Sequence, residues 1–335
     1  MKNDKILLSH GSGGKLSQSL IEDVFLPILQ NSLLAPLDDG AVFNIQSENL
    51  VMTTDSYVVD PIFFAGGDIG KLAVAGTVND LSVMGAVPRY LSLGFIIEEG
   101  FSVADLQRIL ASVKDTCEAA GVNIVTGDTK VVPQGLMDKI FINTTGIGEL
   151  FNNFKMTRQI QKGDKIIING TIGDHGTTIM ANREGLKMHS QLKSDCAPLN
   201  GLIHSLDELA DHIHLMRDPT RGGVATVLNE MVEKSELGIV LQEDAFPVRD
   251  EVRGLCEILG LDPLYIANEG KVLIAAGESV ADEILRKIKT HPLGEEACII
   301  GEVTEEHAGR VVLETGFGSR RIVDMLTGEQ LPRIC

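Results

Sequence analysis

The sequence has few cysteines, few basic residues and no long apolar stretch. Its 5 cysteines form no Cys-x-x-Cys pair and lie far apart in the chain, which disfavours a structural zinc site or a disulfide framework. No apolar run approaches the roughly 20 residues that a membrane-spanning helix needs, and the N-terminus lacks the apolar stretch of a signal peptide. We therefore expect a cytoplasmic protein with no membrane partner. The formal net charge of −18 argues against a nucleic-acid partner, because phosphates would be repelled.

The motifs of the common nucleotide-binding folds are also missing. There is no Gly-x-x-x-x-Gly-Lys-Ser/Thr loop, no protein-kinase signature and no Gly-x-Gly-x-x-Gly after a predicted strand, so the corresponding folds are disfavoured. What is present is a chain of 335 residues, 44% of them hydrophobic, which is long enough for two folded domains. We predict an N-terminal segment and helix at 1–35, a first domain at 36–150, a second α/β domain at 151–310 and a tail at 311–335.

Apolar periodicity predicts alternating strands and helices in both halves. The first half is expected to have helices near 17–29, 69–84 and 102–121, and strands near 50–54, 90–97, 122–125 and 140–146. A linker is expected near 151–162. The second half has expected strands at 165–169, 272–276 and 297–303, and helices that end near 183 or cover 198–212, 219–234 and 252–259. This mixture predicts the α/β or α+β class.

Three of the cysteines are predicted to be core residues. Cys117 and Cys256 fall on the apolar faces of predicted helices, and Cys298 lies in an apolar strand. Thiols in such places pack like small apolar side chains. Besides Cys335, Cys196 is then the only other candidate for an exposed thiol.

The last residue, Cys335, is a candidate nucleophile. A terminal residue is mobile and a thiolate is strongly nucleophilic, so the tail is able to carry a sulfur-bound group into a pocket of the protein. Residues 316–321 contain two glycines and two arginines, and we expect them to form a flexible, positively charged neck. On the tail alone, the alternative is a frayed terminus that ends in cysteine by chance.

Carboxylates recur at the predicted ends of strands and helices: Asp38, Asp39, Asp55, Asp80, Asp128 and Asp218. Such hard ligands on glycine-rich loops, without a His/Cys cluster, suit Mg²⁺ that carries a nucleoside triphosphate. Asp80 interrupts a nearly apolar helix, where a carboxylate must be paired or bind a metal; its alternative is a capping or structural role. The adjacent acids before Gly40 are equally compatible with a turn, and Asp218 before Pro219 is also a good helix N-cap.

Several longer motifs resemble the HypE family of hydrogenase-maturation proteins. They extend over essentially the whole chain and are His10-Gly-Ser-Gly-Gly14, Thr54-Asp55-Ser56, Gly70-Lys71-Leu72-Ala73, Asn79-Asp80, Thr126-Gly127-Asp128-Thr129-Lys130, Gly173-Asp174-His175-Gly176, Arg217-Asp218-x-Thr220-Arg221-Gly222-Gly223, Asn268-Glu269-Gly270-Lys271 and Pro332-Arg333-Ile334-Cys335. The C-terminal motif and the Thr-Gly-Asp-Thr-Lys segment are highly specific. This family belongs to the superfamily of aminoimidazole-ribonucleotide synthetase, selenophosphate synthetase and thiamine-monophosphate kinase.

The resemblance implies a fold and a reaction. The implied fold has two α/β domains, with the first-domain sheets of two subunits paired in a homodimer, and a mobile C-terminal tail. The implied reaction is ATP-dependent dehydration of a carbamoyl group on Cys335 to a thiocyanate, which supplies cyanide for the iron of nickel–iron hydrogenases. The implied partners are the carbamoyltransferase HypF and the HypC–HypD iron-scaffold complex.

The resemblance also assigns candidate site residues. Catalytic roles go to Cys335, Lys130 and Glu269, and either of the last two is a candidate for the base that removes the amide protons. ATP-binding roles go to Lys71, Thr77, Asn79, Asp128, Gly222 and Gly223. The implied Mg²⁺ ligands are Asp38, Asp39, Asp55, Asp80 and Asp218.

Blander interpretations stay open beside these assignments. Lys130 is able simply to pair with Asp128, and Glu269 to be a surface acid at the start of a strand. One alternative function is another ATP-dependent synthetase or kinase of the same superfamily, acting on a free small molecule. A second is a non-catalytic thiol carrier or metal chaperone that uses Cys335 only for docking.

Overall fold

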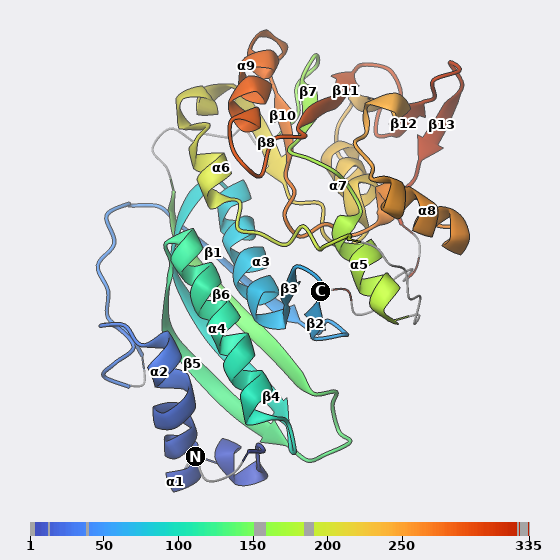
Figure 1. Ribbon diagram of the computed structural model, residues 1–335. Coiled ribbons are helices and arrows are strands. Elements are labelled where there is room, and N and C mark those ends of the chain that lie inside the picture. Colours follow the sequence, from blue (N-terminus) through green and yellow to red (C-terminus); the bar gives the residue numbers. More distant parts are fainter. Residues whose placement is uncertain are drawn as a thin grey trace.

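The computed structural model has two α/β domains, each built on its own sheet (Figure 1). It describes residues 4–12, 14–37, 40–150, 159–183, 191–326, 328 and 334. Three predicted site residues, Asp38, Asp39 and Cys335, fall outside this part of the chain. The predicted α/β class with two domains is confirmed.

The first domain contains a 4-stranded sheet of order β1-β6-β4-β5, antiparallel except for the parallel pair β4 and β5. Helices α3 and α4 lie on one face of it (Figure 1). The elements are η1 (Leu8–Gly11), α1 (Lys15–Leu20), the π-helical η2 (Ile21–Phe25), α2 (Leu26–Leu29), β1 (Leu50–Tyr57), β2 (Phe63–Phe64), β3 (Gly67–Asp68), α3 (Ile69–Val83), β4 (Ala86–Glu98), α4 (Val103–Ala120), β5 (Asn123–Val132) and β6 (Ile140–Leu150).

Helix α3 is the buried centre of the first domain. Its start is capped by Asp68, whose carboxylate accepts hydrogen bonds from the backbone amides of Gly70 and Lys71, as an N-cap residue does. Small side chains let it pack against the sheet, against α4 and against the second domain. At Gly76 a Cβ atom would lie 2.3 Å from the Tyr57 hydroxyl, so only glycine fits. Such close packing fixes the position of Asp80 near the C-terminal end of the helix.

The second domain contains a 7-stranded sheet of order β13-β12-β9-β11-β7-β10-β8. Its strands are β7 (Lys165–Ile168), β8 (Ile213–Arg217), β9 (Gly238–Gln242), β10 (Leu273–Ala276), β11 (Cys298–Thr304), β12 (Val311–Glu314) and β13 (Arg320–Val323). Its helices are α5 (Asp174–Arg183), α6 (Asn200–His204), η3 (Asp207–His212), α7 (Gly223–Val232), η4 (Glu243–Ala245), α8 (Asp250–Leu259), η5 (Pro263–Tyr265) and α9 (Glu278–Lys289).

Both faces of the second sheet are covered. Along β7, Ile166 and Ile168 pack into one apolar cluster and Ile167 into another, as expected when side chains alternate across a strand. The first-domain core continues across the domain boundary, because Ile179, Cys196 and Ala267 belong to it. No helix in the described ranges is sufficiently long and apolar to span a bilayer.

Three local predictions are wrong. The segment 126–130 does not follow a short strand but lies inside β5, because pairing with β4 extends that strand to Val132. Residues 316–321 are not a flexible neck: β12 and β13 form a hairpin, and Arg321 pairs with Asp262 at 2.6 Å. The helix predicted at 198–212 is split into α6 and η3.

Candidate active site

Three carboxylates from different elements influence one another at the boundary of the two domains. Asp55 lies on β1, Asp80 on α3 and Asp218 directly after β8. Burial and the negative charge of Asp80 raise the pKa of Asp218 to about 7. Burial also raises the pKa of Asp80, partly offset by a hydrogen bond that the Thr53 hydroxyl donates to its Oδ2 at 2.8 Å. The site therefore carries surplus negative charge that a bound cation would stabilise.

Glu269 is buried beside these acids. Glu269 is only 3% exposed, and its Oε1 has no hydrogen-bond partner among the described residues. Burial, together with the charges of Asp195, Asp218 and Asp55, raises its pKa well above the usual range. This position rules out the interpretation of Glu269 as a surface acid.

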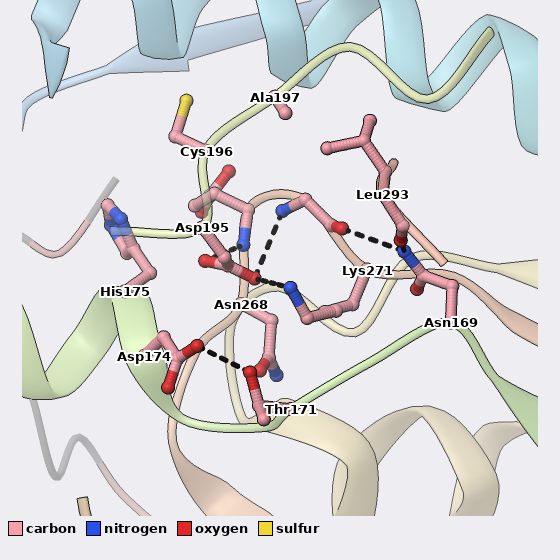
Figure 2. Close-up of polar contacts among 12 residues, drawn as sticks. Asn169, Thr171, Asp174, His175, Asp195, Cys196, Ala197, Asn268, Lys271 and Leu293 are labelled. Carbon is pink, nitrogen blue, oxygen red and sulfur yellow. Dashed lines mark hydrogen bonds and ion pairs between the residues drawn. The ribbon is translucent and has the colours of Figure 1, made fainter. Parts of the chain in front are cut away.

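The buried ion pair of Lys271 and Asp195, drawn in Figure 2, lies next to Glu269 in the fold. Lys271 Nζ lies 3.1 Å from Asp195 Oδ2, and the two side chains are 10% and 3% exposed. The Asp195 carboxylate also accepts hydrogen bonds from the backbone amides of Glu269 and Gly270, at 3.1 and 3.3 Å. Burial raises the pKa of Asp195, but the Lys271 ammonium and the other donors outweigh it and hold that pKa below its usual value. The ion pair and these two hydrogen bonds thus fix the position of the loop that carries Glu269.

The end of the tail docks at the same place. Ile334 is 3% exposed and belongs to the first-domain core together with Phe64, Ile179 and Cys196. The prediction that Cys196 is exposed is wrong, because the segment 194–197 runs between the two domains and buries the thiol. Burial also raises the pKa of Cys196 well above its usual value. Cys117 and Cys256 are buried as predicted, and Cys298 is half-buried.

Lys130 and Asp128 lie away from this cluster. They form an exposed ion pair, with Lys130 Nζ 2.8 Å from Asp128 Oδ1. Across the sheet, Asp128 lies opposite Gly94, which lies opposite Asn143, which in turn lies opposite Ser56. Asp55 is the neighbour of Ser56 on β1. Since alternate residues of a strand face opposite sides, Asp128 and Lys130 share the open face of the sheet, and Asp55 faces α3.

The residues predicted to bind ATP have different surroundings. Thr77 is completely buried between Tyr57 and the Thr144 hydroxyl, so it presents no atom to a nucleotide here. Asn79 is also buried, donating to the carbonyls of Ala197 and Glu269 and accepting from the Leu199 amide at 2.7 Å. Both side chains are thus occupied by contacts within this chain, and their predicted part in ATP binding stays a prediction.

Lys71 borders a cavity, and the two predicted glycines lie in a tight turn. Lys71 lines a polar cavity of about 950 Å³ that Asp174, Asp195 and Lys271 also border. Gly222 and Gly223 have φ values of 75° and 62° at the start of α7. Because Gly222 caps that helix, Asp218 is not the N-cap that the sequence predicts. A Cβ at Gly223 would lie 2.5 Å from the Leu264 carbonyl oxygen, so a turn and a close contact both require glycine there.

The acids fit a cation only together with further ligands. No group of three or more His, Cys, Asp or Glu side chains within the described ranges is arranged to hold a metal ion by itself. Mg²⁺ commonly takes one or two carboxylates and completes its shell with water and substrate phosphates. Asp55, Asp80 and Asp218 suit that mode of binding.

Two contributors to the site were not predicted from the sequence. Asp195 is not among the predicted site residues, and His175 occurs only within the motif Gly173-Asp174-His175-Gly176, without an assigned role. A signal existed for each: an acid and a histidine between apolar or small residues must be paired when buried. The long-range partners Lys271 and Ile334, however, are visible only in the folded chain.

Comparison with known proteins agrees with this architecture. Residues 37–150 match the N-terminal domain, and residues 161–314 the C-terminal domain, of AIR synthase related proteins. The carbamoyl dehydratase HypE of Rhodobacter capsulatus is 48% identical over 339 residues, covering 100% of this chain and 99% of the relative.

Solved structures are similarly close. The crystal structure of the hydrogenase maturation protein HypE in complex with ATP is 50% identical, with a TM-score of 0.94, covering 98% of this chain and 99% of that one. A HypE–HypF complex is 47% identical, with a TM-score of 0.81 and coverage of 92% and 100%. This similarity over the full length shows that the chain belongs to the HypE family of AIR synthase related proteins.

Proposed function

We propose that this protein is an ATP-dependent carbamoyl dehydratase that converts an S-carbamoyl group on Cys335 into a thiocyanate. The observation that carries this proposal is the buried Ile334, which lies in the core shared with the segment that anchors Glu269. Ile334 directly precedes Cys335 in the sequence, so its burial beside this segment supports delivery of the Cys335 thiol to this site. The name of the relatives, carbamoyl dehydratase, supports dehydration of a carbamoyl group.

The proposed chemistry balances as follows. The carbamoyl oxygen attacks the γ-phosphorus of ATP, and ADP leaves. The oxygen is then part of a phosphate ester, which is a far better leaving group than the amide oxygen. Loss of the two protons on nitrogen and expulsion of phosphate form the C≡N bond. The sum is S-carbamoyl plus ATP giving S-cyanate, ADP and phosphate, and the cyano group then serves hydrogenase maturation.

Glu269 is the better candidate for the base that accepts the amide proton. It is buried at the boundary where the tail docks, and its Oε1 has no partner in the described ranges. A carboxylate with a raised pKa is a stronger base once it is ionised. Lys130, by contrast, is exposed, paired with Asp128 and on the open face of the first sheet. Lys130 therefore requires a second subunit to reach a tail docked on this one.

A homodimer would cover that open face. Met52 and Ile96 are 70% and 46% exposed there, which is unusual for apolar side chains on a sheet that stays uncovered. Pairing of two such sheets also protects the edge strands β1 and β5. We include Lys130 and Asp128 in the proposed site through this pairing.

Mg²⁺ is proposed as the metal, held by Asp55, Asp80 and Asp218, with Asp38 and Asp39 as further candidates. When bound, the ion offsets negative charge on the phosphates of ATP. Asp80 and Asp218 contribute carboxylates whose raised pKa values fall when a cation arrives. Lys71, Gly222 and Gly223 are proposed to contact the nucleotide.

The proposed partners follow the family. The solved HypE–HypF complex supports a carbamoyltransferase of the HypF type as the source of the carbamoyl group. A HypC–HypD iron scaffold is proposed as the acceptor of the cyano group. We propose a cytoplasmic location.

The direct test is the mass of the C-terminal peptide. The full chain is carbamoylated with HypF, ATP and carbamoyl phosphate, then freed from HypF and mixed with fresh ATP and Mg²⁺. We expect the peptide that ends in Cys335 to lose the mass of one water molecule, and a Cys335→Ser variant to remain unmodified. A carbamoyl group that persists while ATP is intact would favour the thiol carrier, and turnover on a free small molecule would favour another superfamily enzyme.

A further inference from the structure

His175 joins the docked tail to the second domain. It lies on α5 and is completely buried. Its Nε2 is 2.9 Å from the carbonyl oxygen of Ile334, and its Nδ1 is 2.8 Å from the Ser194 hydroxyl. The edge of the ring meets Phe64 with the centroids 5.5 Å apart. Figure 2 shows the imidazole beside Asp195 and Cys196.

These contacts select one form of the imidazole. A carbonyl oxygen only accepts hydrogen bonds, so Nε2 must carry the proton that is donated to Ile334. The Ser194 hydroxyl oxygen accepts from the Cys196 amide at 3.1 Å, and its own hydrogen is free to be donated to Nδ1 of a neutral ring. Burial lowers the pKa of His175, although the nearby Asp195 and the bond to Ile334 oppose this. The ring is therefore neutral with its hydrogen on Nε2.

We propose that His175 is the positioning residue that holds the C-terminal tail in its reactive, inward state. The hydrogen bond is made to the backbone of Ile334. It therefore positions the chain directly before Cys335 and does not involve the sulfur atom. Loss of the bond releases the tail, and the neutral ring then needs another partner for Nε2. This inference rests on the proposed role of Cys335, because positioning matters only if that thiol carries the reacting group.

The surroundings favour such a latch over a plain core histidine. Nε2 bonds the far end of the chain, at a separation of 159 residues, and not a group of the second-domain sheet. Ile334 itself is held by the burial of its side chain and by this hydrogen bond to its carbonyl.

The first experiment measures access to Cys335 in the full-length protein without ATP. The alkylation rate of the C-terminal peptide is followed by mass spectrometry in the parent chain and in His175→Leu and His175→Gln variants. We expect His175→Leu to raise the rate about tenfold, the equivalent of losing one buried hydrogen bond. The glutamine amide keeps a donor, so His175→Gln should restore much of the protection. His214→Gln, at a histidine that pairs with Asp164 in the second domain, is the control and should leave the rate unchanged.

Several results would overturn the latch. One is a folded His175→Leu protein that is alkylated at the parent rate. If that variant does not fold, Ser194→Ala takes its place and should raise the rate several-fold, and an unchanged rate overturns the proposal equally. A measurement on the parent chain needs no variant: the nitrogen-15 spectrum of His175 should show a neutral ring protonated on Nε2, and a proton on Nδ1 alone contradicts the bond to Ile334.

The readout separates this inference from the proposed reaction. Alkylation and the tautomer report on the tail position whether or not dehydration occurs. If His175 protects Cys335 but no carbamoyl group is dehydrated, the latch stands and the proposed reaction fails. If dehydration proceeds while His175 has no influence on access, the reaction stands and the latch fails.

Discussion

Replacing Glu269 by glutamine tests the proposed base and the electrostatics of the site together. The substitution keeps the size of the side chain and removes its charge. General-base catalysis contributes roughly 10²–10⁴-fold to a rate, so dehydration of carbamoylated Cys335 should slow by about that factor. ATP binding should persist, because Glu269 is not among the residues proposed to contact the nucleotide.

The same substitution should change the pH dependence of stability. The pKa of Glu269 is raised in the folded state by burial and by nearby acids. As the pH rises above the ordinary pKa of a glutamate, about 4.3, the unfolded chain loses this proton first, so folding stability falls until the folded-state pKa is passed. Glutamine has no proton to lose. As the pH rises through this interval, the free energy of unfolding of Glu269→Gln should therefore increase relative to that of the parent protein, by up to about 1.4 kcal/mol per pH unit.

Urea unfolding of both proteins at several pH values between 5 and 8 measures this difference, and single-turnover mass spectrometry measures the rate. Glu257→Gln, at an acid on the outer face of α8, is the matched control and should alter neither. A parent-like dehydration rate in Glu269→Gln would refute the base. A stability difference that stays flat with pH would refute the raised pKa of the buried Glu269 carboxyl.

Three further substitutions test other parts of the account. Asp80→Asn should abolish ATP turnover in a folded protein, and unchanged Mg²⁺-ATP affinity measured by calorimetry would speak against a ligand role. Lys271→Met leaves Asp195 buried without its cation and should cost about 3–5 kcal/mol of unfolding free energy, so a loss below 1 kcal/mol in urea would show that the pair is dispensable. Gly223→Ala places a Cβ 2.5 Å from a carbonyl oxygen at a φ of 62° and should destabilise by more than about 1 kcal/mol; thermal unfolding at the parent temperature would contradict this.

The sequence predicted well those features that depend on local pattern. The amphipathic helix α4, with its Ser102 cap and its end at Gly121, agrees with the predicted 102–121. The nearly apolar run that became α3 was also recognisable, because its residues are small and apolar on every side. Two domains of the α/β class follow from such elements.

The positions that failed depend on pairing between distant segments. Pairing with neighbouring strands extends β1 to Tyr57 and β5 to Val132. Asp55 and Asp128 therefore lie inside strands and not at their ends. Burial of Cys196 arises from the contact of the two domains, which no local pattern encodes. The separation of Lys130 from Glu269 likewise depends on the register of β5, and a single residue of register moves a side chain to the other face.

In the proposed reaction, ATP activates the carbamoyl oxygen on Cys335 for removal. This step can be followed with a carbamoyl group labelled with the heavy oxygen isotope on the tail of the full-length protein, to which unlabelled ATP and Mg²⁺ are added. We expect the label to appear in inorganic phosphate in step with formation of the thiocyanate. Label released into water, with none in phosphate, would contradict it.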